Sequence, residues 1–333
     1  MPAVSVLIPC FNVERYVREC LDSVVNQTLG DLEILCINDG STDATPDILR
    51  EYAARDARIR IIDKPNSGYG DSMNRGLDAA SGEYIGIVES DDRAEPDMFE
   101  TLYSLAETLD CDLVKGNFYS MRGGVSTPGN LIAQNDAGFL MRPSQRSSVF
   151  AVPDYIWTAV YRRSWLNECG IRFLPTPGAS YQDTSFNFKA LSLARRALFT
   201  HKPLLHYRRD NELSSVHSTG KVFCVCDEYR EIERFLQEHP ELSHLVPVAQ
   251  KMKYQSYFWN FRRLAPPANR QFGVLAAAQF AEAFRLGLIR RDLFRPKHYR
   301  RLRLWARMPR LFFALESLRA ARKKLSAALR GRS

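Results

Sequence analysis

The chain has little of what marks a membrane-spanning, secreted or metal-thiolate protein. No apolar run reaches the roughly 20 residues that a membrane-spanning helix needs; residues 274–284 come nearest, and Gln279 and Glu282 interrupt them. The seven cysteines contain no Cys-x-x-Cys pair, which argues against a zinc site, and unpaired thiols are typical of a reducing compartment. No signal-peptide pattern precedes the first apolar run, so these features predict a cytoplasmic protein.

Net positive charge is missing from most of the chain and concentrated at its C-terminal end. Residues 285–333 carry sixteen Lys and Arg and two acidic residues, whereas the whole chain has a formal net charge of +8. Leu302, Trp305 and Phe312 recur at helical spacing among the arginines, and Pro309 should divide the segment into two helices. A basic amphipathic helix with aromatic residues is typical of a segment that binds an anionic membrane surface. The alternatives are a helix packed on the body of the protein and a nucleic-acid tail. Nothing else indicates a nucleic-acid partner, and we expect none.

Short apolar runs alternate with helical patterns through the first hundred residues. The runs cover residues 3–8, 32–37, 60–63 and 84–88. Strands and helices that alternate at this spacing indicate βαβ units and a parallel sheet. The sequence therefore predicts an α/β fold for this part of the chain.

Polar clusters follow three of the four predicted strands, at residues 9–12, 38–43 and 89–92. The carboxyl ends of parallel strands meet at one edge of a sheet, where open α/β sheets bind ligands. Burying the carboxylates of the third cluster is costly unless a cation or hydrogen-bond donors meet them. Oxygen ligands suit Mg²⁺ or Mn²⁺, and such metals usually bind together with phosphates. The pattern predicts a site for a metal and a nucleoside diphosphate; the alternative is a solvated acidic turn before the next helix.

In this order and spacing, residues 4–12, 38–43, 66–70 and 89–92 resemble glycosyltransferase family 2. The match covers roughly residues 3–100, and a weaker resemblance continues to about residue 230. It implies the GT-A fold, a Rossmann-like, mostly parallel α/β sheet flanked by helices. It also implies a metal-dependent hexosyl- or N-acetylhexosaminyl-transferase that uses Mn²⁺ or Mg²⁺ and a nucleoside-diphosphate sugar, with a UDP-sugar favoured.

The resemblance implies roles for individual residues of these motifs. Asp91 would ligate the metal, and Asp92 would lie on the acceptor side. Glu89 departs from the aspartate usual in the family, and Met73 stands where the family often has arginine. Arg75 is a poor substitute for that arginine, because a helix turns about 100° per residue. The nucleotide-sugar would be bound by Pro9, Phe11, Asn12, Glu14, Asp39, Gly68, Asn74, Glu89, Ser90 and Asp91.

A second constellation surrounds Asp183, near the predicted start of a helix after residues 175–178. The resemblance carries over only this aspartate, since Gln182 stands where the family often has glutamate. The functional interpretation is a general base that takes the proton of the acceptor hydroxyl as it attacks the anomeric carbon. One base with direct displacement implies inversion. The alternative is a carboxylate that only interacts with the helix dipole.

Residues 206–218 resemble the closing loop of the family, which reaches the diphosphate. Arg208, Arg209, Ser214 and Ser215 are the candidates for that contact, and His217 could ligate the metal or hold a phosphate. Trp157 could stack on an acceptor sugar, but a buried structural tryptophan is the alternative.

These interpretations give a catalytic domain at residues 1–235, with a nucleotide-sugar half at 1–115 and an acceptor half at 116–235. A helical region at 236–333 carries the basic tail, 285–333. We expect transfer to a glycan or lipid-linked glycan in cell-surface polysaccharide synthesis, on the inner face of the cell membrane. One rival is a nucleotidyltransferase, disfavoured because no Gly-rich loop with Lys or Arg lies between residues 4 and 39. The other is a non-catalytic GT-A-like scaffold at the membrane.

Overall fold

The computed structural model describes residues 1–129, 132, 134–151, 154–211 and 222–330, without the side chains of 323–325 and 327–330. The chain forms two compact units, Met1–Ser218 and Thr219–Ser333, and each is described here by itself. The boundary expected near residue 235 falls inside helix α7 (Cys224–Glu238), which the contacts group with the second unit.

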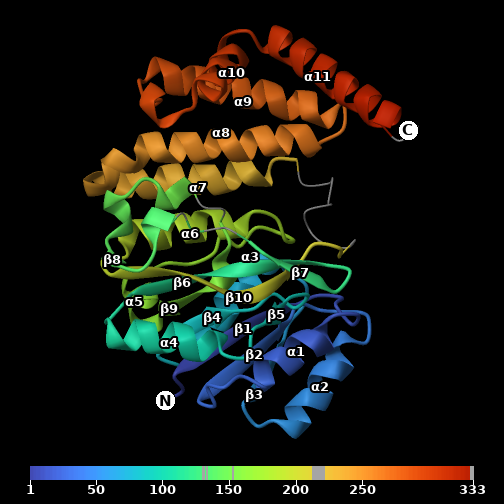
Figure 1. Ribbon diagram of the computed structural model, residues 1–333, viewed down its shortest axis with the longest axis vertical. Helices are drawn as coiled ribbons and strands as arrows, with labels where there is room; N and C mark the ends of the chain where they lie inside the picture. The colour runs from blue at the N-terminus through green and yellow to red at the C-terminus, as the bar shows by residue number, and fades with distance from the viewer. Residues whose placement is uncertain (130–131, 133, 152–153, 212–221, 331–333) are drawn as a thin grey trace. The chain divides into compact units, whose positions relative to one another are not determined.

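The first unit is built on a mixed ten-stranded sheet flanked by helices (Figure 1). The strand order is β3-β2-β1-β4-β9-β6-β10-β5, with β7 beside β6 and β8 beside β10. The first four strands pair in parallel, as their alternation with helices predicts, whereas β9 runs antiparallel to both β4 and β6. The strands are β1 Val4–Cys10, β2 Leu32–Asn38, β3 Ile59–Asp63, β4 Tyr84–Ile87, β5 Arg93–Ala94, β6 Leu113–Arg122, β7 Val125–Pro128, β8 Leu140–Met141, β9 Ala159–Arg162 and β10 Ala197–Arg208.

Hydrophobic burial on both faces explains the central strands. Every residue of β1 and β2 is buried, which is the pattern of parallel strands covered on both sides. Close packing of helices on the sheet requires small residues at two points. A Cβ on Gly86 would lie 2.3 Å from the Phe99 ring, and one on Gly76 would lie 3.1–3.2 Å from the side chains of Leu7 and Ile37. The helices of this unit are α1 Val17–Val25, α2 Thr45–Arg55, α3 Tyr69–Ala79, α4 Met98–Thr108, α5 Arg163–Glu168 and α6 Gln182–Leu193, with 3₁₀ turns at Gln134–Asp136, Pro143–Gln145, Val149–Ala151 and Ile156–Thr158.

The second unit is helical and has an aromatic core. Tyr254 and Tyr257 of α8 pack against Phe280 of α9, with ring centroids 6.4 and 5.6 Å apart. Among the described helices, none combines the length and apolar character needed to cross a membrane. The elements are α7, α8 Val246–Arg263, α9 Ala268–Arg285, α10 Pro296–Arg307 and α11 Pro309–Arg330, with 3₁₀ turns at Pro240–Leu245 and Arg291–Leu293.

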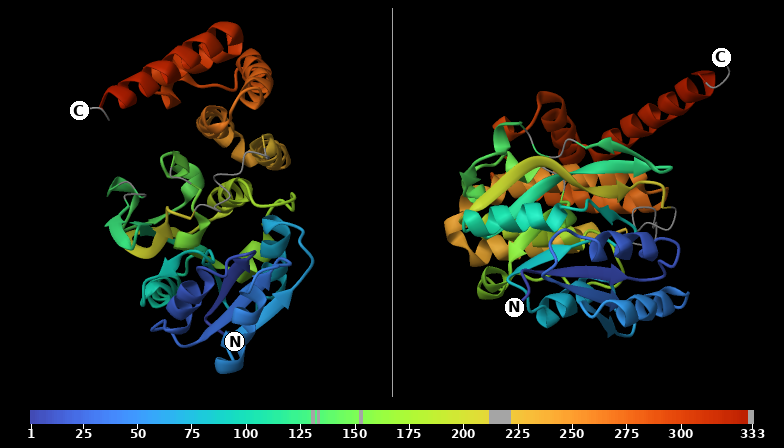
Figure 2. Two further views of the ribbon diagram at one scale, coloured as in Figure 1. Left: turned by 90° about the vertical axis from the view of Figure 1, so that its right-hand side faces the viewer. Right: turned by 60° about the horizontal axis from the view of Figure 1, so that its bottom comes forward.

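The apolar stripe of the basic tail forms part of this core. Trp305 of α10 is fully buried, donates its indole N–H to the Gly273 carbonyl at 2.9 Å and stacks on Phe312 at 4.6 Å. Leu302 is buried too. Truncating a buried tryptophan costs about 3–5 kcal/mol, so α10 is an integral part of the unit. The last turns of α11 project past the other helices of the unit (Figure 2).

Candidate active site

The polar segments that follow β1 and β2 lie side by side at the carboxyl edge of the sheet. The register places Cys10 beside Asn38, and the loops then exchange hydrogen bonds. Asn12 donates its backbone N–H to Ser41 Oγ at 3.0 Å and accepts the Thr42 N–H on its side-chain oxygen at 2.8 Å. Glu14 accepts the Ala44 N–H at 2.8 Å. The proximity predicted for these two loops is therefore present, and Asn12 and Glu14 hold the two loops together.

Asp39 organises the glycine loop rather than facing open solvent. Its carboxylate is 5% exposed and accepts the backbone N–H groups of Ser67 at 2.9 Å and Gly68 at 3.0 Å, together with the buried Lys64 ammonium. From the described residues, Oδ2 accepts only the Gly68 N–H, so the carboxylate keeps acceptor capacity for the base or ribose contact predicted for Asp39.

The glycine loop packs tightly on the segment that precedes α6. Gly68 has φ +100°, and a Cβ there would lie 2.5 Å from the Gly178 nitrogen. A Cβ on Gly70 would lie 2.1 Å from the Leu174 carbonyl oxygen, and Tyr69 donates its N–H to the Gly178 carbonyl at 2.9 Å. These contacts explain both glycines and connect the predicted donor loop to the segment that carries Asp183.

Glu89 and Asp183 both lie near Tyr69, the first residue of α3. The Tyr69 hydroxyl donates to Glu89 Oε1 at 2.7 Å. Burial raises the pKa of Glu89 to about 7, while the Tyr69 hydrogen bond lowers it. Burial raises the pKa of Tyr69 as well, and the negative charges of Glu89 and Asp183 raise it further. The structure thus brings the predicted donor-side carboxylate and the predicted base to one tyrosine.

Gln182 explains how Asp183 is placed. Tyr181 has a left-handed backbone, φ +66°, and α6 begins at the next residue. The Gln182 amide is buried and donates to Thr176 Oγ1 at 2.9 Å and to the Gly178 carbonyl at 3.0 Å. A glutamate could not donate these bonds when ionised. The glutamine therefore fixes the loop before the helix and, with it, the first turn that carries Asp183.

Asp91 and Asp92 have different surroundings although they are adjacent. Asp91 is partly exposed, and its Oδ2 accepts from the Asn211 amide at 2.7 Å. Asp92 is 1% exposed, accepts the Arg208 backbone N–H at 2.8 Å, and has one buried oxygen without a partner among the described atoms. Burial raises the pKa of Asp92 well above its usual range, and the neighbouring charge of Asp91 adds to this. Buried in this way, Asp92 does not present its carboxylate to an acceptor.

Arg208 is held by contacts on the protein side. Its guanidinium donates to the Asp91 carbonyl at 2.8 Å, forms an ion pair with Glu19 and lies over the Tyr16 ring at 4.8 Å. These contacts position Arg208 beside the acidic turn, where the sequence predicts the diphosphate. Arg209, the next candidate along the chain, contacts the Tyr155 hydroxyl instead. Ser214, Ser215 and His217 lie outside the described residues.

The acidic turn fits a hard cation only in part. No group of three or more His, Cys, Asp or Glu within the described part of the chain could hold a metal ion. The partly exposed Asp91 carboxylate supplies oxygen ligands of the kind that Mg²⁺ and Mn²⁺ prefer. These metals usually bind through one or two carboxylates together with substrate phosphates. The residues present thus fit a metal that arrives with a diphosphate rather than a metal held by protein ligands alone.

The buried Lys115 interacts with the charges of both Asp154 and Asp183. Burial lowers the pKa of Lys115 to about 8, and the charges of Asp154 and Asp183 oppose that shift. Burial raises the pKa of Asp154 to about 6, against hydrogen bonds from Thr184 and Asn187. Lys115 also donates to the Tyr155 carbonyl. The sequence reasoning missed this pair, although a lysine inside the apolar run 113–118 was an available signal.

Trp157 belongs to a cluster of four aromatic rings. It stacks on Tyr155 at 4.7 Å and on Tyr207 at 4.9 Å, and Phe118 packs edge-on at 5.4 Å. Trp157 is 5% exposed, whereas Tyr155 and Tyr207 are partly exposed. A sugar that stacks here would therefore contact the two tyrosines, and Trp157 packs against their rings from the buried side.

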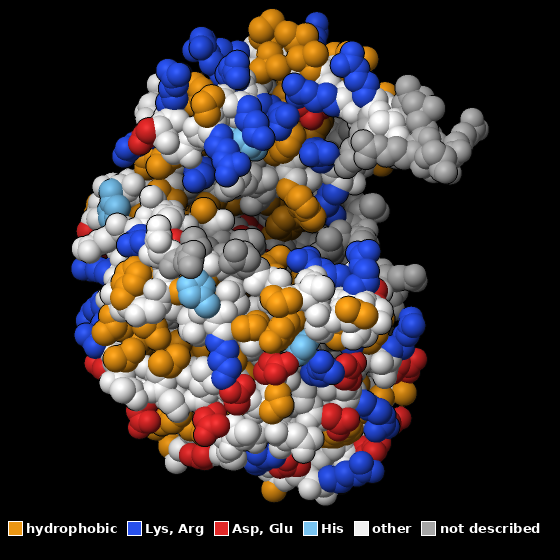
Figure 3. Space-filling model, viewed as in Figure 1, with side chains coloured by type: hydrophobic (Ala, Val, Ile, Leu, Met, Phe, Trp, Pro, Cys, Tyr) orange, Lys and Arg blue, Asp and Glu red, His pale blue; other side chains and the backbone are white. Residues whose placement is uncertain are grey.

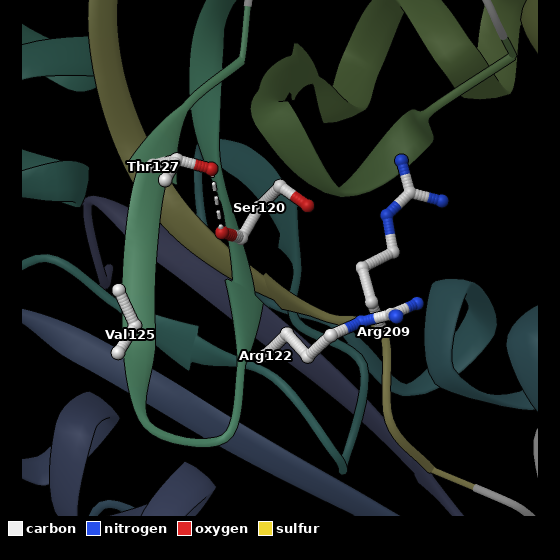
Figure 4. A pocket seen from close by; sticks show the side chains of 5 residues that line it. All are labelled: Ser120, Arg122, Val125, Thr127 and Arg209. Carbon is white, nitrogen blue, oxygen red and sulfur yellow. Dashed lines mark hydrogen bonds between the residues drawn. The ribbon is translucent and has the colours of Figure 1, made fainter. Parts of the chain in front are cut away.

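A cavity of about 520 Å³ lies next to this cluster (Figure 4). It is lined by Ser120 and Arg122 of β6, Val125 and Thr127 of β7, and Arg209, which follows β10. Thr127 Oγ1 donates to the Ser120 carbonyl at 3.3 Å, across the hairpin.

Comparison with known proteins identifies the family. Residues 5–170 match the model of glycosyl transferase family 2. The uncharacterized glycosyltransferase YibD of Escherichia coli is 30% identical over 243 residues, which are 71% of this chain and 70% of YibD. The chain belongs to glycosyltransferase family 2. This is the family that the motifs resemble. The putative glycosyltransferase EpsH of Bacillus subtilis is 37% identical over 214 residues, 62% of this chain and 61% of EpsH, so the match spans about three fifths of that relative.

Solved structures show the same fold. Staphylococcus aureus TarS 1–349 in complex with UDP has a TM-score of 0.72 at 19% identity, covering 96% of this chain and 92% of that one. The mannosyltransferase PcManGT of Pyrobaculum calidifontis, in complex with GDP-Man and Mn²⁺, has a TM-score of 0.55 at 17% identity, covering 94% and 85%. The predicted GT-A fold with a C-terminal helical region is confirmed.

In this family 2 protein, the side chains of helix α3 that follow the glycine loop mainly contact the protein itself. Met73, at the position where arginine is frequent, is fully buried. The Asn74 amide exchanges two hydrogen bonds of 2.9 Å with the Phe173 backbone, so both ends of its amide are engaged there. Arg75 binds Asp71 at 3.0 Å and extends toward solvent. The described residues thus offer no cation in place of the family arginine on this helix.

Proposed function

We propose that the protein transfers a hexosyl or N-acetylhexosaminyl group from a UDP-sugar to a hydroxyl of a glycan or lipid-linked glycan, with inversion at the anomeric carbon. The observation that carries this proposal is the position of Tyr69. Its hydroxyl binds Glu89 and its pKa responds to the charge of Asp183, so both the donor-side carboxylate and the base candidate interact with this one residue. The complexes of TarS with UDP and UDP-GlcNAc support the choice of donor.

On the donor side, the loops after β1 and β2 and the glycine loop would hold the nucleotide. Phe11 is an exposed aromatic residue at this edge, available to stack on a base. Asp39 fixes the backbone of Ser67 and Gly68 that forms the adjoining wall. We assign Pro9, Asn12, Glu14 and Ser90 to the same pocket on the basis of the motif.

On the acceptor side, Asp183 would accept the proton of the attacking hydroxyl. A positioned base contributes typically 10²–10⁴-fold. Lys115, whose charge interacts with that carboxylate, would lie next to the base. A bound Mn²⁺ or Mg²⁺, with Asp91 as a ligand, would offset the growing negative charge of the leaving diphosphate. Because that side then needs no proton donor, one base suffices.

We further propose that residues 1–218 form the catalytic domain and that the helical unit associates peripherally with an anionic membrane surface. Four cationic residues of α10, Lys297, Arg300, Arg303 and Arg307, are exposed and lie three to four positions apart, which places them on one face. Figure 3 shows Lys and Arg side chains gathered over the helices of this unit. The acceptor assignment, a surface polysaccharide or its lipid-linked precursor, follows from that location.

The first test is calorimetric titration of the full chain with UDP, GDP, CDP and dTDP, each with Mn²⁺ and with a chelator. We expect UDP to bind, and the chelator to weaken its binding. A preference for another nucleotide would replace the donor assignment. If no nucleotide binds the folded protein, the enzyme proposal fails and the scaffold alternative gains support. With the donor nucleotide known, anomeric analysis of the transferred product tests inversion.

A further inference from the structure

The cavity at the β6–β7 hairpin has the chemistry of an anion site. Arg122 and Arg209 line it, and neither forms an ion pair with any described residue. Figure 4 shows their side chains on the same side of the hairpin, together with the Ser120 hydroxyl. A guanidinium group presents five N–H donors in a planar fork that matches a carboxylate or a phosphate.

Arg209 is oriented but keeps donors available. Its guanidinium carbon lies 4.3 Å from the centre of the Tyr207 ring, and Nη2 is 3.5 Å from the Tyr155 hydroxyl. A cation held over an aromatic face loses less freedom when it binds a ligand. Asp210 is the acidic neighbour; its carboxylate accepts the Gly123 N–H at 2.6 Å and so is committed to the hairpin turn. Two arginines beside one engaged carboxylate leave the cavity net positive.

The placement of the cavity assigns it to the acceptor rather than to the donor. Successive residues of an extended strand point to opposite faces, and Arg209 continues the pairing of β10 by donating its N–H to the Met121 carbonyl at 2.9 Å. Arg208 therefore faces Asp91 and Glu19, whereas Arg209 faces Tyr155.

A series of protein contacts connects the lining of the cavity to the proposed base. Arg209 contacts the Tyr155 hydroxyl, and the Tyr155 carbonyl accepts from Lys115. The charge of Lys115 in turn interacts with Asp183. Tyr155 and Tyr207 are partly exposed and lie beside Arg209, on the side where we place the acceptor.

We propose that this cavity binds an anionic group of the acceptor, a carboxylate or a phosphate carried on a sugar next to the one that attacks. The proposal rests on the proposed transferase function and names the acceptor as an acidic glycan. Neutral polysaccharide acceptors would leave two arginines without a partner.

Ligand binding is the test, because it does not require the natural acceptor. The probes are a hexuronate-containing tetrasaccharide, the same tetrasaccharide with its carboxyl groups reduced to alcohols, and inorganic phosphate. Binding to the UDP-loaded full chain is followed by isothermal titration calorimetry. The proteins are the wild type, the double variant Arg122→Gln/Arg209→Gln, and Arg50→Gln as a control for removal of an exposed arginine elsewhere on the same unit.

We expect the wild type to bind the uronate probe or phosphate at least about tenfold more tightly than the reduced probe, a difference of the size that charge-assisted hydrogen bonds give. Tight binding of the uronate probe would indicate a uronate on the acceptor, and tight binding of inorganic phosphate would indicate a phosphate. The double variant should lose this preference, and Arg50→Gln should keep it. Equal binding of charged and neutral probes by the wild type, or a preference that survives in the double variant, overturns the proposal.

UDP titration separates this inference from the proposed function. If the double variant loses UDP binding while Arg50→Gln keeps it, the arginines serve the donor, and the acceptor inference fails while the transferase proposal stands. If no protein of the set binds UDP or another nucleoside diphosphate, the transferase proposal itself fails.

Discussion

Tyr69 donates a hydrogen bond to Glu89 at 2.7 Å, and this contact connects the helix that follows the glycine loop to the acidic turn after β4. Glu89 is partly buried; burial raises its pKa to about 7, and the Tyr69 hydrogen bond lowers it. Tyr69 also interacts with the charge of Asp183. Mutation of either Tyr69 or Glu89 should therefore change which of these groups carries a proton at a given pH.

Asp183→Asn should abolish transfer without weakening UDP binding. The amide keeps the size of the side chain but cannot accept a proton, so the rate of sugar transfer should fall about 10²–10⁴-fold. Single-turnover transfer and UDP calorimetry measure the two effects. Asp78→Asn, an exposed aspartate of α3, is the control. A variant that keeps more than a tenth of the wild-type rate would rule out Asp183 as the base.

Glu89→Gln should stabilise the metal-free protein at alkaline pH. The folded-state pKa of about 7 lies above the ordinary value of 4.5, so the stabilising contribution of Glu89 is present below pH 4.5 and is lost as the pH rises through 7. The glutamine side chain carries no charge at any of these pH values, so the variant does not lose stability as the pH rises. Its free energy of unfolding at pH 8 should therefore exceed that of the wild type by up to about 3 kcal/mol. Denaturant titrations at pH 5 and pH 8 measure it, with the exposed Glu107→Gln as control. An equal effect at both pH values would contradict the shifted pKa.

Tyr69→Phe should move the pH dependence of activity. The Tyr69 hydroxyl lowers the pKa of Glu89, so removing it raises that pKa further above 7. If donor binding uses the ionised carboxylate, the acidic limb of the kcat/KM profile shifts to higher pH. An unshifted profile with a uniformly lower rate would instead indicate that the tyrosine has a packing role.

Replacement of Lys297, Arg300, Arg303 and Arg307 by glutamine should release the protein from anionic vesicles. Each cation near such a surface contributes about 1 kcal/mol, so binding should weaken by at least two orders of magnitude. Cosedimentation with phosphatidylserine vesicles measures this, and phosphatidylcholine vesicles give the background. Truncation of the tail is a poor test, because Trp305 and Phe312 belong to the core of the helical unit. Unchanged binding would mean that another surface meets the membrane.

Periodicity and motif order predicted the parallel half of the sheet, because β1 to β4 are continuous apolar runs with helices between them. The antiparallel partners could not be predicted: β9 and β5 are four and two residues long, too short to carry a period. Their pairing is decided by long-range contacts that local sequence does not record.

The residues of the candidate site, too, could be predicted only where a local motif contains them. Asp91 and Asp183 could be named from motifs, whereas Tyr69, Lys115 and Asp154 become part of the site only through folding. The sequence also gave no means of telling a residue that faces a ligand from one that holds a loop. Asp39, Asn74 and Asp92 match motif positions, yet their side chains bind backbone groups of the protein.

The glycine loop and the loop before α6 touch with no room for a side chain between them, at Gly68 against Gly178 and at Gly70 against Leu174. Two segments joined this closely move as one body. A side chain added at either glycine would therefore displace both the predicted donor loop and the stretch that leads into Asp183.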